Sequence, residues 1–131
     1  MTQIWKEDVV IPVSVIQLDG KSDPAELKVG DLVKVSGITK GRGNAGLVKR
    51  HQFKGGPQTH GQKNRLRHSG SIGNTSPQRI IPGRHMAGRM GGVRFTVKNL
   101  RVVDINTETK IVMIHGAVPG YNKRSVLEIV K

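Results

Sequence analysis

The sequence predicts an all-β protein: a small antiparallel barrel or sandwich into which a long, basic, glycine-rich loop is inserted. Residues 1–39 and 93–131 contain short runs of alternating Val and Ile, and no segment has a convincing helical period. Residues 40–92 contain only 11 hydrophobic residues but most of the 17 glycines, so they cannot build a core. Because 131 residues is the usual size of one domain, we expect a single domain over residues 1–131, with residues 40–92 as its extension.

Two strands are expected before the insertion. Residues 9–18 are rich in Val and Ile, and their odd-numbered apolar side chains would share one face of a strand. Residues 29–38 form the second strand, with Val33 and Val35 turned toward the core. The insertion would leave the barrel directly after this strand.

Further strands are expected after the insertion. Residues 93–98 alternate apolar and polar side chains. Residues 101–105 and 111–115 are joined through the polar residues 106–109, which favours a hairpin with a polar turn. Residues 126–130 form the last strand.

Charge is strongly segregated along the chain. The sequence has 22 Lys plus Arg against 9 Asp plus Glu, a formal net charge of +13. Residues 32–101 contain 15 of the basic residues and no acid, so this window carries +15 and the rest of the chain −2. An ordinary solvated surface mixes both signs. The acid-free window therefore indicates a polyanionic partner.

A dinucleotide cofactor is not expected. Gly41, Gly43 and Gly46 form a GxGxxG pattern after a predicted strand. The cofactor site would also need a helix that begins in this loop and an acid about 20 residues later. No helix is expected there, and the next acid is Asp104.

Catalytic and metal sites are not expected either. The chain has no Cys, and its loop histidines His51, His60, His68 and His85 are 9, 8 and 17 residues apart, which matches no common ligand spacing. The nearest acids are at positions 31 and 104, so no carboxylate is available in sequence to orient an imidazole. Stacking on bases and hydrogen bonding to RNA are the more ordinary roles of such histidines.

The remaining interpretation is a surface that binds folded RNA through its shape and backbone. The chain has only four aromatic residues, too few for single-strand stacking platforms, and no recognition helix for the major groove of DNA. It also lacks an amphipathic helix for a membrane surface, an apolar run long enough to cross a bilayer and a recognisable N-terminal targeting segment. We thus expect an unexported protein whose RNA contacts are Lys40, Arg42, Lys49, Arg50, His51, Lys54, His60, Lys63, Arg65, Arg67, His68, Arg79, Arg84, His85, Arg89 and Arg94.

Four ordered motifs resemble one protein family. They read KVSGITKGRGNAGLVKRHQFKGGPQTHG, RHSGSIG, IPGRHMAGRMGG and HGAVPG. In this order they resemble the bacterial type of the large-subunit ribosomal protein L-three (universal uL-three) family. The resemblance covers most of residues 28–131. In one respect the chain departs from the family, which has a substantial segment where this chain has only QLDGKSDPAEL.

The resemblance implies a specific function. It implies a translation-protein-type barrel on the large ribosomal subunit, with the loop running into ribosomal RNA (rRNA) toward the peptidyl transferase centre, and a role in subunit assembly. The expected partners are large-subunit rRNA and neighbouring ribosomal proteins on a cytoplasmic or organellar ribosome, with no enzymatic activity, membrane or small-molecule substrate. The alternative is a free-standing RNA chaperone or regulator that uses the same type of barrel.

Overall fold

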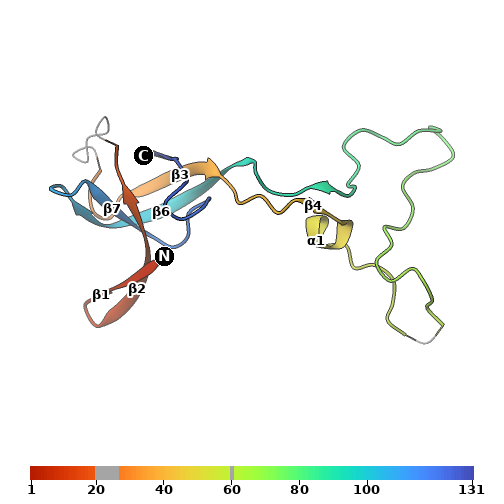
Figure 1. Ribbon diagram of the computed structural model, residues 1–131, viewed down its shortest axis with the longest axis horizontal. Helices are drawn as coiled ribbons and strands as arrows, with labels where there is room; N and C mark the ends of the chain where they lie inside the picture. Colours follow the sequence, from red (N-terminus) through yellow and green to blue (C-terminus); the bar gives the residue numbers. More distant parts are fainter. Residues whose placement is uncertain (20–26, 60) are drawn as a thin grey trace. The chain divides into compact units, whose positions relative to one another are not determined.

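The computed structural model describes residues 1–19, 27–59 and 61–131 and divides the chain into two compact units (Figure 1). Unit 1 consists of Met1–Lys40 and Gly92–Lys131, and unit 2 consists of Gly41–Gly91. Unit 2 lies within the glycine-rich residues 40–92.

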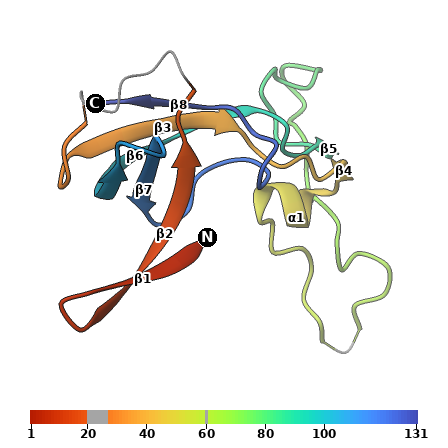
Figure 2. The same ribbon diagram turned by 60° about the vertical axis from the view of Figure 1, so that its left-hand side comes forward.

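Unit 1 is a six-stranded sheet in which every pairing is antiparallel, so the all-β prediction is confirmed. The strand order is β1-β2-β7-β6-β3-β8, and β8 runs along β3 (Figure 2). The strands are β1 (Thr2–Lys6), β2 (Val9–Gln17), β3 (Leu32–Ile38), β6 (Arg94–Asn106), β7 (Ile111–His115) and β8 (Leu127–Val130).

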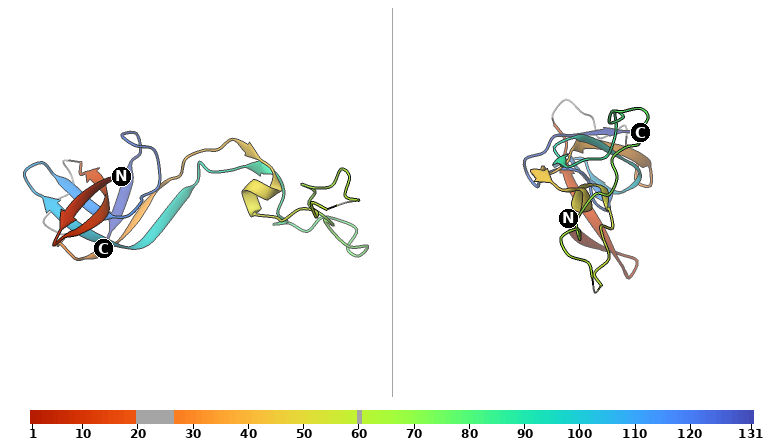
Figure 3. Two further views of the ribbon diagram at one scale, coloured as in Figure 1. Left: turned by 90° about the horizontal axis from the view of Figure 1, so that it is seen from below. Right: turned by 90° about the vertical axis from the view of Figure 1, so that its right-hand side faces the viewer.

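Strand β6 joins the two halves of this sheet. Its first part runs beside β3 and its second part beside β7, across the polar turn that the sequence predicted (Figure 3). The β3 register shifts between Val33 and Val35, opposite the left-handed residue Asn99, whose φ is 59°. A second shift lies between Val102 and Asp104. Such bulges bend and twist a strand, which lets one 13-residue strand serve both halves.

The sheet does not close into a barrel within the described residues. Its hydrogen-bonded order has two ends, β1 and β8. Strand β8 has only four residues and pairs with β3, whereas β1 pairs with β2 alone. The expected all-β class and antiparallel pairing are therefore confirmed, but the expected closure of the sheet into a barrel is wrong.

The core lies on one face of this sheet. It contains Val33 and Val35 from β3, Val102 from β6, and Val112 and Ile114 from β7, each with no more than 1% of its surface exposed. The inward orientation predicted for the two β3 valines is confirmed. Partly buried Leu and Ile side chains from the rest of unit 1 complete the cluster.

Burial is not uniform among the odd-numbered side chains expected to share one face of β2, although Val13 is fully buried. Val9 and Val15 are 60% and 50% exposed, whereas Ile16 packs against the core. Ser14 is opposite Ile114 in the β2–β7 ladder, so the even-numbered positions share the face of the buried β7 side chains. Val9 lies in the part of β2 that pairs only with β1, where no core covers it.

Two contacts hold the short strand β8 in place. Leu127 of β8 packs against Gly37 of β3, where an added Cβ atom would lie 2.5 Å from Leu127 Cδ2 and would force that side chain to move. Lys131 Nζ lies 2.7 Å from Asp31 Oδ2. The Lys131 ammonium, followed by the Lys28 backbone N–H, holds the pKa of Asp31 below its usual value. This contact contributes stability above the unfolded-state pKa of Asp31 and loses it as the pH falls.

Unit 2 begins and ends at neighbouring positions of unit 1. The backbone N–H of Thr39 donates to Val93 O at 2.9 Å, and that of Gly92 donates to Thr39 O at 3.2 Å. These bonds continue the β3–β6 pairing by one step beyond the strands. The chain therefore leaves unit 1 after β3 and returns to it before β6.

The base of unit 2 has its own secondary structure. Strands β4 (Asn44–Ala45) and β5 (Gly88–Arg89) form a two-stranded ladder, and helix α1 (Leu47–His51) lies next to it (Figure 2). The expectation that no helix follows Gly46 is thus wrong, because Gly46 is the N-cap of α1. The helix has only five residues and ends at the left-handed Gln52, which explains why no helical period was visible.

Candidate nucleic-acid interface

The cationic side chains of unit 2 fall into two groups, those held by the chain itself and those that are free. Nine of the predicted contact residues are exposed and make no side-chain hydrogen bond or ion pair within the described part of the chain. No acid occurs between residues 32 and 101, so unit 2 offers them no carboxylate partner. These nine are Arg42, Lys49, Lys54, Lys63, Arg65, Arg67, His68, Arg79 and Arg89.

Two arginines of unit 2 are held by backbone carbonyls. Arg50 Nη1 donates to Met86 O at 2.6 Å, and Arg84 donates to Ser71 O. A Cβ atom at Gly88 would lie 2.9 Å from Arg50 Nη1, so the guanidinium fills the space above this glycine. Arg50 therefore ties α1 to the returning part of unit 2 and has fewer donors left for phosphate.

Aromatic rings also connect helix α1 with the returning part of unit 2. The rings of His51 and His85 are stacked, with centroids 4.1 Å apart and an interplanar angle of 3°. Phe53 lies at 6.3 Å from each of them in a tilted orientation. His51 Nε2 is buried and has no hydrogen-bond partner in the described chain. We call the set Arg50, His51, Phe53, His85 and Met86 the clasp.

The clasp and the β4–β5 ladder fix the cations at the base of unit 2. Arg42 N donates to Met90 O at 2.8 Å, and Met90 N donates to Gly43 O at 2.9 Å, which extends the ladder by a further step. Arg42, Lys49 and Arg89 are exposed on this framework. Backbone pairing thus presents three free cations from segments more than 35 residues apart in sequence.

The clasp gives a prediction for the free protein. His85→Ala removes the stacked ring, an interaction of about 0.5–1.5 kcal/mol, so exchange of the Met90 amide hydrogen should be about 2- to 12-fold faster. NMR-detected hydrogen exchange measures this rate. His68→Ala is the matched control, because His68 is exposed and its ring stacks on no aromatic ring in the described residues. Equal exchange rates in the two variants would contradict a stabilising stack.

The remaining predicted residues lie elsewhere. Lys40 and Arg94 belong to unit 1, where Lys40 Nζ lies 5.9 Å from the centre of the Tyr121 ring and Arg94 forms an ion pair with Glu128. His60 lies outside the described residues. The structure gives Arg94 an acidic partner that is distant in sequence, so part of its charge is neutralised within the chain.

The sequence did not predict a pocket that the structure shows in unit 2. An open pocket of about 660 Å³ is lined by residues 68–74 and 78–80, including the amide side chains of Asn74 and Gln78. The lining also contains Ile72 and Ile80, which are 44% and 46% exposed. The available signal was the presence of amides and isoleucines within an otherwise cationic, glycine-rich segment.

The described residues contain no group of three or more His, Cys, Asp or Glu side chains that could hold a metal ion. No helix among them is long and apolar enough to cross a membrane.

Comparison with known proteins gives a consistent result. A family model described as "Ribosomal protein L3" matches residues 22–111. The "Large ribosomal subunit protein uL3" of Chlorobaculum tepidum is 50% identical over 113 residues, which cover 85% of this chain and 54% of that protein. For Chlorobium limicola the identity is 54% over 104 residues, with 79% and 49% covered. For Dehalococcoides mccartyi it is 39% over 130 residues, with 98% and 63% covered.

These matches differ in how much of each relative is covered. This chain spans about half the length of the first two relatives. The family model nevertheless covers well over half of this chain and includes all of unit 2. The chain therefore belongs to the ribosomal protein L3 family.

Proposed function

We propose that this chain is a structural, RNA-binding constituent of the large ribosomal subunit and not an enzyme. The observation that carries the proposal is the acid-free unit 2, in which nine exposed Lys, Arg and His side chains make no side-chain hydrogen bond or ion pair within the described chain. Its relatives are named as proteins of the large ribosomal subunit. Large-subunit rRNA is the polyanion that suits both facts.

The arrangement of unit 2 favours binding to the RNA backbone. Arg and Lys side chains bind phosphate, and glycine-rich backbone can lie close to sugar and phosphate because it has few side chains to obstruct it. Ala45 is the only hydrophobic residue of unit 2 that is fully buried in the described structure. Contacts with RNA would therefore supply stabilisation that unit 2 cannot obtain from a core of its own.

The proposal extends to position and assembly. By resemblance to the family, residues 40–92 would run into rRNA toward the peptidyl transferase centre and support assembly of the subunit. Unit 1, with an acid-to-base balance closer to even, would rest against rRNA and neighbouring ribosomal proteins on the surface. The site of action would be the ribosome.

Sedimentation of the tagged chain from lysate tests this function. Stoichiometric recovery with large subunits through a high-salt wash is expected of an integral constituent, because many buried phosphate contacts dissociate slowly. A chain in which Arg42, Lys49 and Arg89 are replaced by Ala should be recovered in lower yield. Recovery of the unmodified chain only in the soluble pool would overturn the proposal in favour of a free-standing RNA chaperone or regulator.

A further inference from the structure

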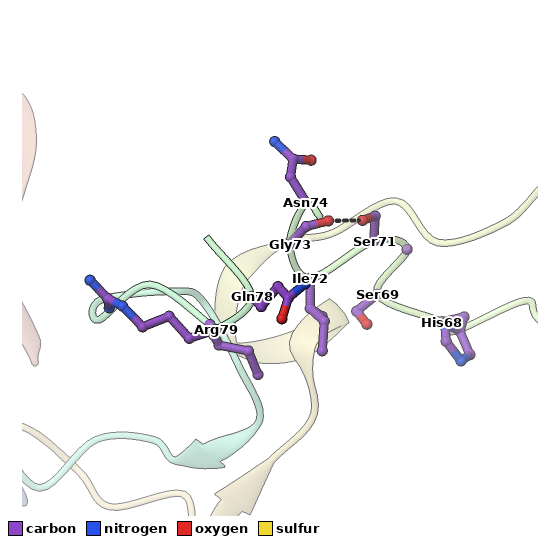
Figure 4. Close-up of a pocket in the computed structure, with 10 residues that line it drawn as sticks. His68, Ser69, Ser71, Ile72, Gly73, Asn74, Gln78 and Arg79 are labelled. Carbon is purple, nitrogen blue, oxygen red and sulfur yellow. Dashed lines mark hydrogen bonds between the residues drawn. The ribbon is translucent and has the colours of Figure 1, made fainter. Parts of the chain in front are cut away.

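The open pocket in unit 2 has two walls from different segments. Residues 68–74 form one wall and residues 78–80 form the other. A Cβ atom at Gly73 would lie 3.9 Å from Arg79 O, so the two segments approach closely at this point. Ser71 Oγ donates to Gly73 O at 2.9 Å (Figure 4). Arg84 donates to Ser71 O, so both a hydroxyl and a guanidinium hold the first wall.

The lining combines three kinds of side chain. Ile72 lies next to Gln78 (Figure 4). Ile80 also lines the pocket. Asn74 and Gln78 each offer an amide that both donates and accepts hydrogen bonds. Arg79 extends from one end of the group, and His68 lies at the other end (Figure 4). The pocket thus has apolar surface, two amides and cationic or polar groups at its ends.

We propose that this pocket receives one unpaired nucleotide of an RNA, an inference that rests on the RNA-binding function proposed above. Its volume of about 660 Å³ lies in the usual range for small-ligand sites, about 300–1,000 Å³. Unpaired bases expose their Watson–Crick edges to amides, whereas in an RNA helix these edges are paired and the narrow major groove excludes side chains. The half-exposed isoleucines give the base an apolar surface to pack on. Arg79 is placed to contact a flanking phosphate.

A protein ligand suits the pocket less well. Apart from its isoleucines the lining is polar, and the surrounding segment has a high positive charge with no acid from residue 32 to residue 101. Interfaces between proteins are depleted of charge at their centre. A nucleotide, in contrast, uses the amides, the apolar surface and the cations together.

The test uses the full chain and a set of RNA hairpins. A fully paired hairpin is compared with four variants that carry one unpaired A, C, G or U in the same stem. At least one bulged hairpin should bind about fivefold tighter or more than the paired one, near the lower limit for a specific base contact. An Asn74→Ala/Gln78→Ala variant should lose this preference, and both positions are exposed, so the fold should be unaffected.

A Lys49→Ala/Arg89→Ala variant is the matched control. It should weaken the binding of all five hairpins by the same factor, because these cations lie outside the pocket and would contact phosphate. Equal affinities of the wild-type chain for all five hairpins, or a preference that survives in the amide variant, would overturn the pocket proposal and leave RNA binding intact. Binding of no hairpin would contradict the proposed function as well.

Cross-linking gives a second, independent readout. With 4-thiouridine as the unpaired base, irradiation should attach the RNA to the tryptic peptide of residues 68–79, which lies between the cleavage sites Arg67 and Arg79. This peptide contains most of the pocket lining. Cross-links confined to other peptides would exclude the pocket as the site of the unpaired base.

Discussion

The affinity of the full chain for large-subunit rRNA is expected to fall about 10³- to 10⁴-fold between 50 and 200 mM salt. The acid-free window contains 15 basic residues. If about half of them contact phosphate, the slope of log affinity against log salt is roughly −5 to −7, because each neutralised phosphate adds about 0.7 to 0.9. Nine free cationic or imidazole side chains in unit 2 alone are enough to supply these contacts.

A salt titration of binding by filter retention or fluorescence anisotropy measures this slope. Arg65→Ala/Arg67→Ala should make the slope shallower by about 1 to 2. Lys110→Ala/Lys123→Ala, a matched loss of two exposed charges in unit 1, should leave it nearly unchanged. A wild-type slope shallower than about −2 would contradict binding through the phosphate backbone.

Ile114→Ala is expected to lower the free energy of unfolding of unit 1 by about 2–5 kcal/mol. Ile114 is fully buried at the centre of the core, between strands β2 and β6. Its removal leaves a cavity that the surrounding valines, which are stiff and short, cannot fill. Since small domains are stable by only about 5–15 kcal/mol, this one change should remove a large share of the total.

Urea denaturation followed by circular dichroism measures this loss. Val15→Ala is the control, because Val15 lies on β2 beside the same β7 strand but is 50% exposed. Its effect should stay below about 1 kcal/mol. Similar losses of unfolding free energy in the two variants would contradict a core centred on Ile114.

The strands were predictable from the sequence where one face of the strand is buried. Val33 and Val35 alternate with polar side chains, and the hairpin between β6 and β7 has both apolar arms and a polar turn. In β2 every position from 9 to 16 except Pro12 and Ser14 is a Val or Ile, so alternation could not show which face is buried. Pairing with Ile114 places Ser14 on the core face, whereas Val13 on the other face is buried as well, and both results depend on how the sheet is assembled.

The incomplete closure and the short helix depend on other interactions. Sheet closure requires edge strands long enough to meet, which alternation within one strand does not reveal. Helix α1 has five residues and is accompanied by the Arg50–Met86 contact and the His51–His85 stack. A helix this short has little intrinsic stability, so tertiary contacts decide whether it forms.

The candidate site was predictable as a region and less so residue by residue. Charge segregation points to residues 32–101, which include unit 2, because it follows from counting acids and bases. Whether an arginine is free depends on partners far away in sequence. Arg50 is 36 residues from its acceptor Met86, and Arg94 is 34 residues from Glu128. Composition gives no indication of these partners.

Limited digestion with trypsin, with and without large-subunit rRNA, tests the central claim most directly: that unit 2 is the RNA-binding element. Lys63, Arg65 and Arg67 are exposed and free in the described structure, so the free chain should be cut there rapidly. Bound rRNA should protect these three sites much more than Lys110 and Lys123 of unit 1. Cleavage at Lys63, Arg65 and Arg67 that is equally fast with and without rRNA would contradict the account.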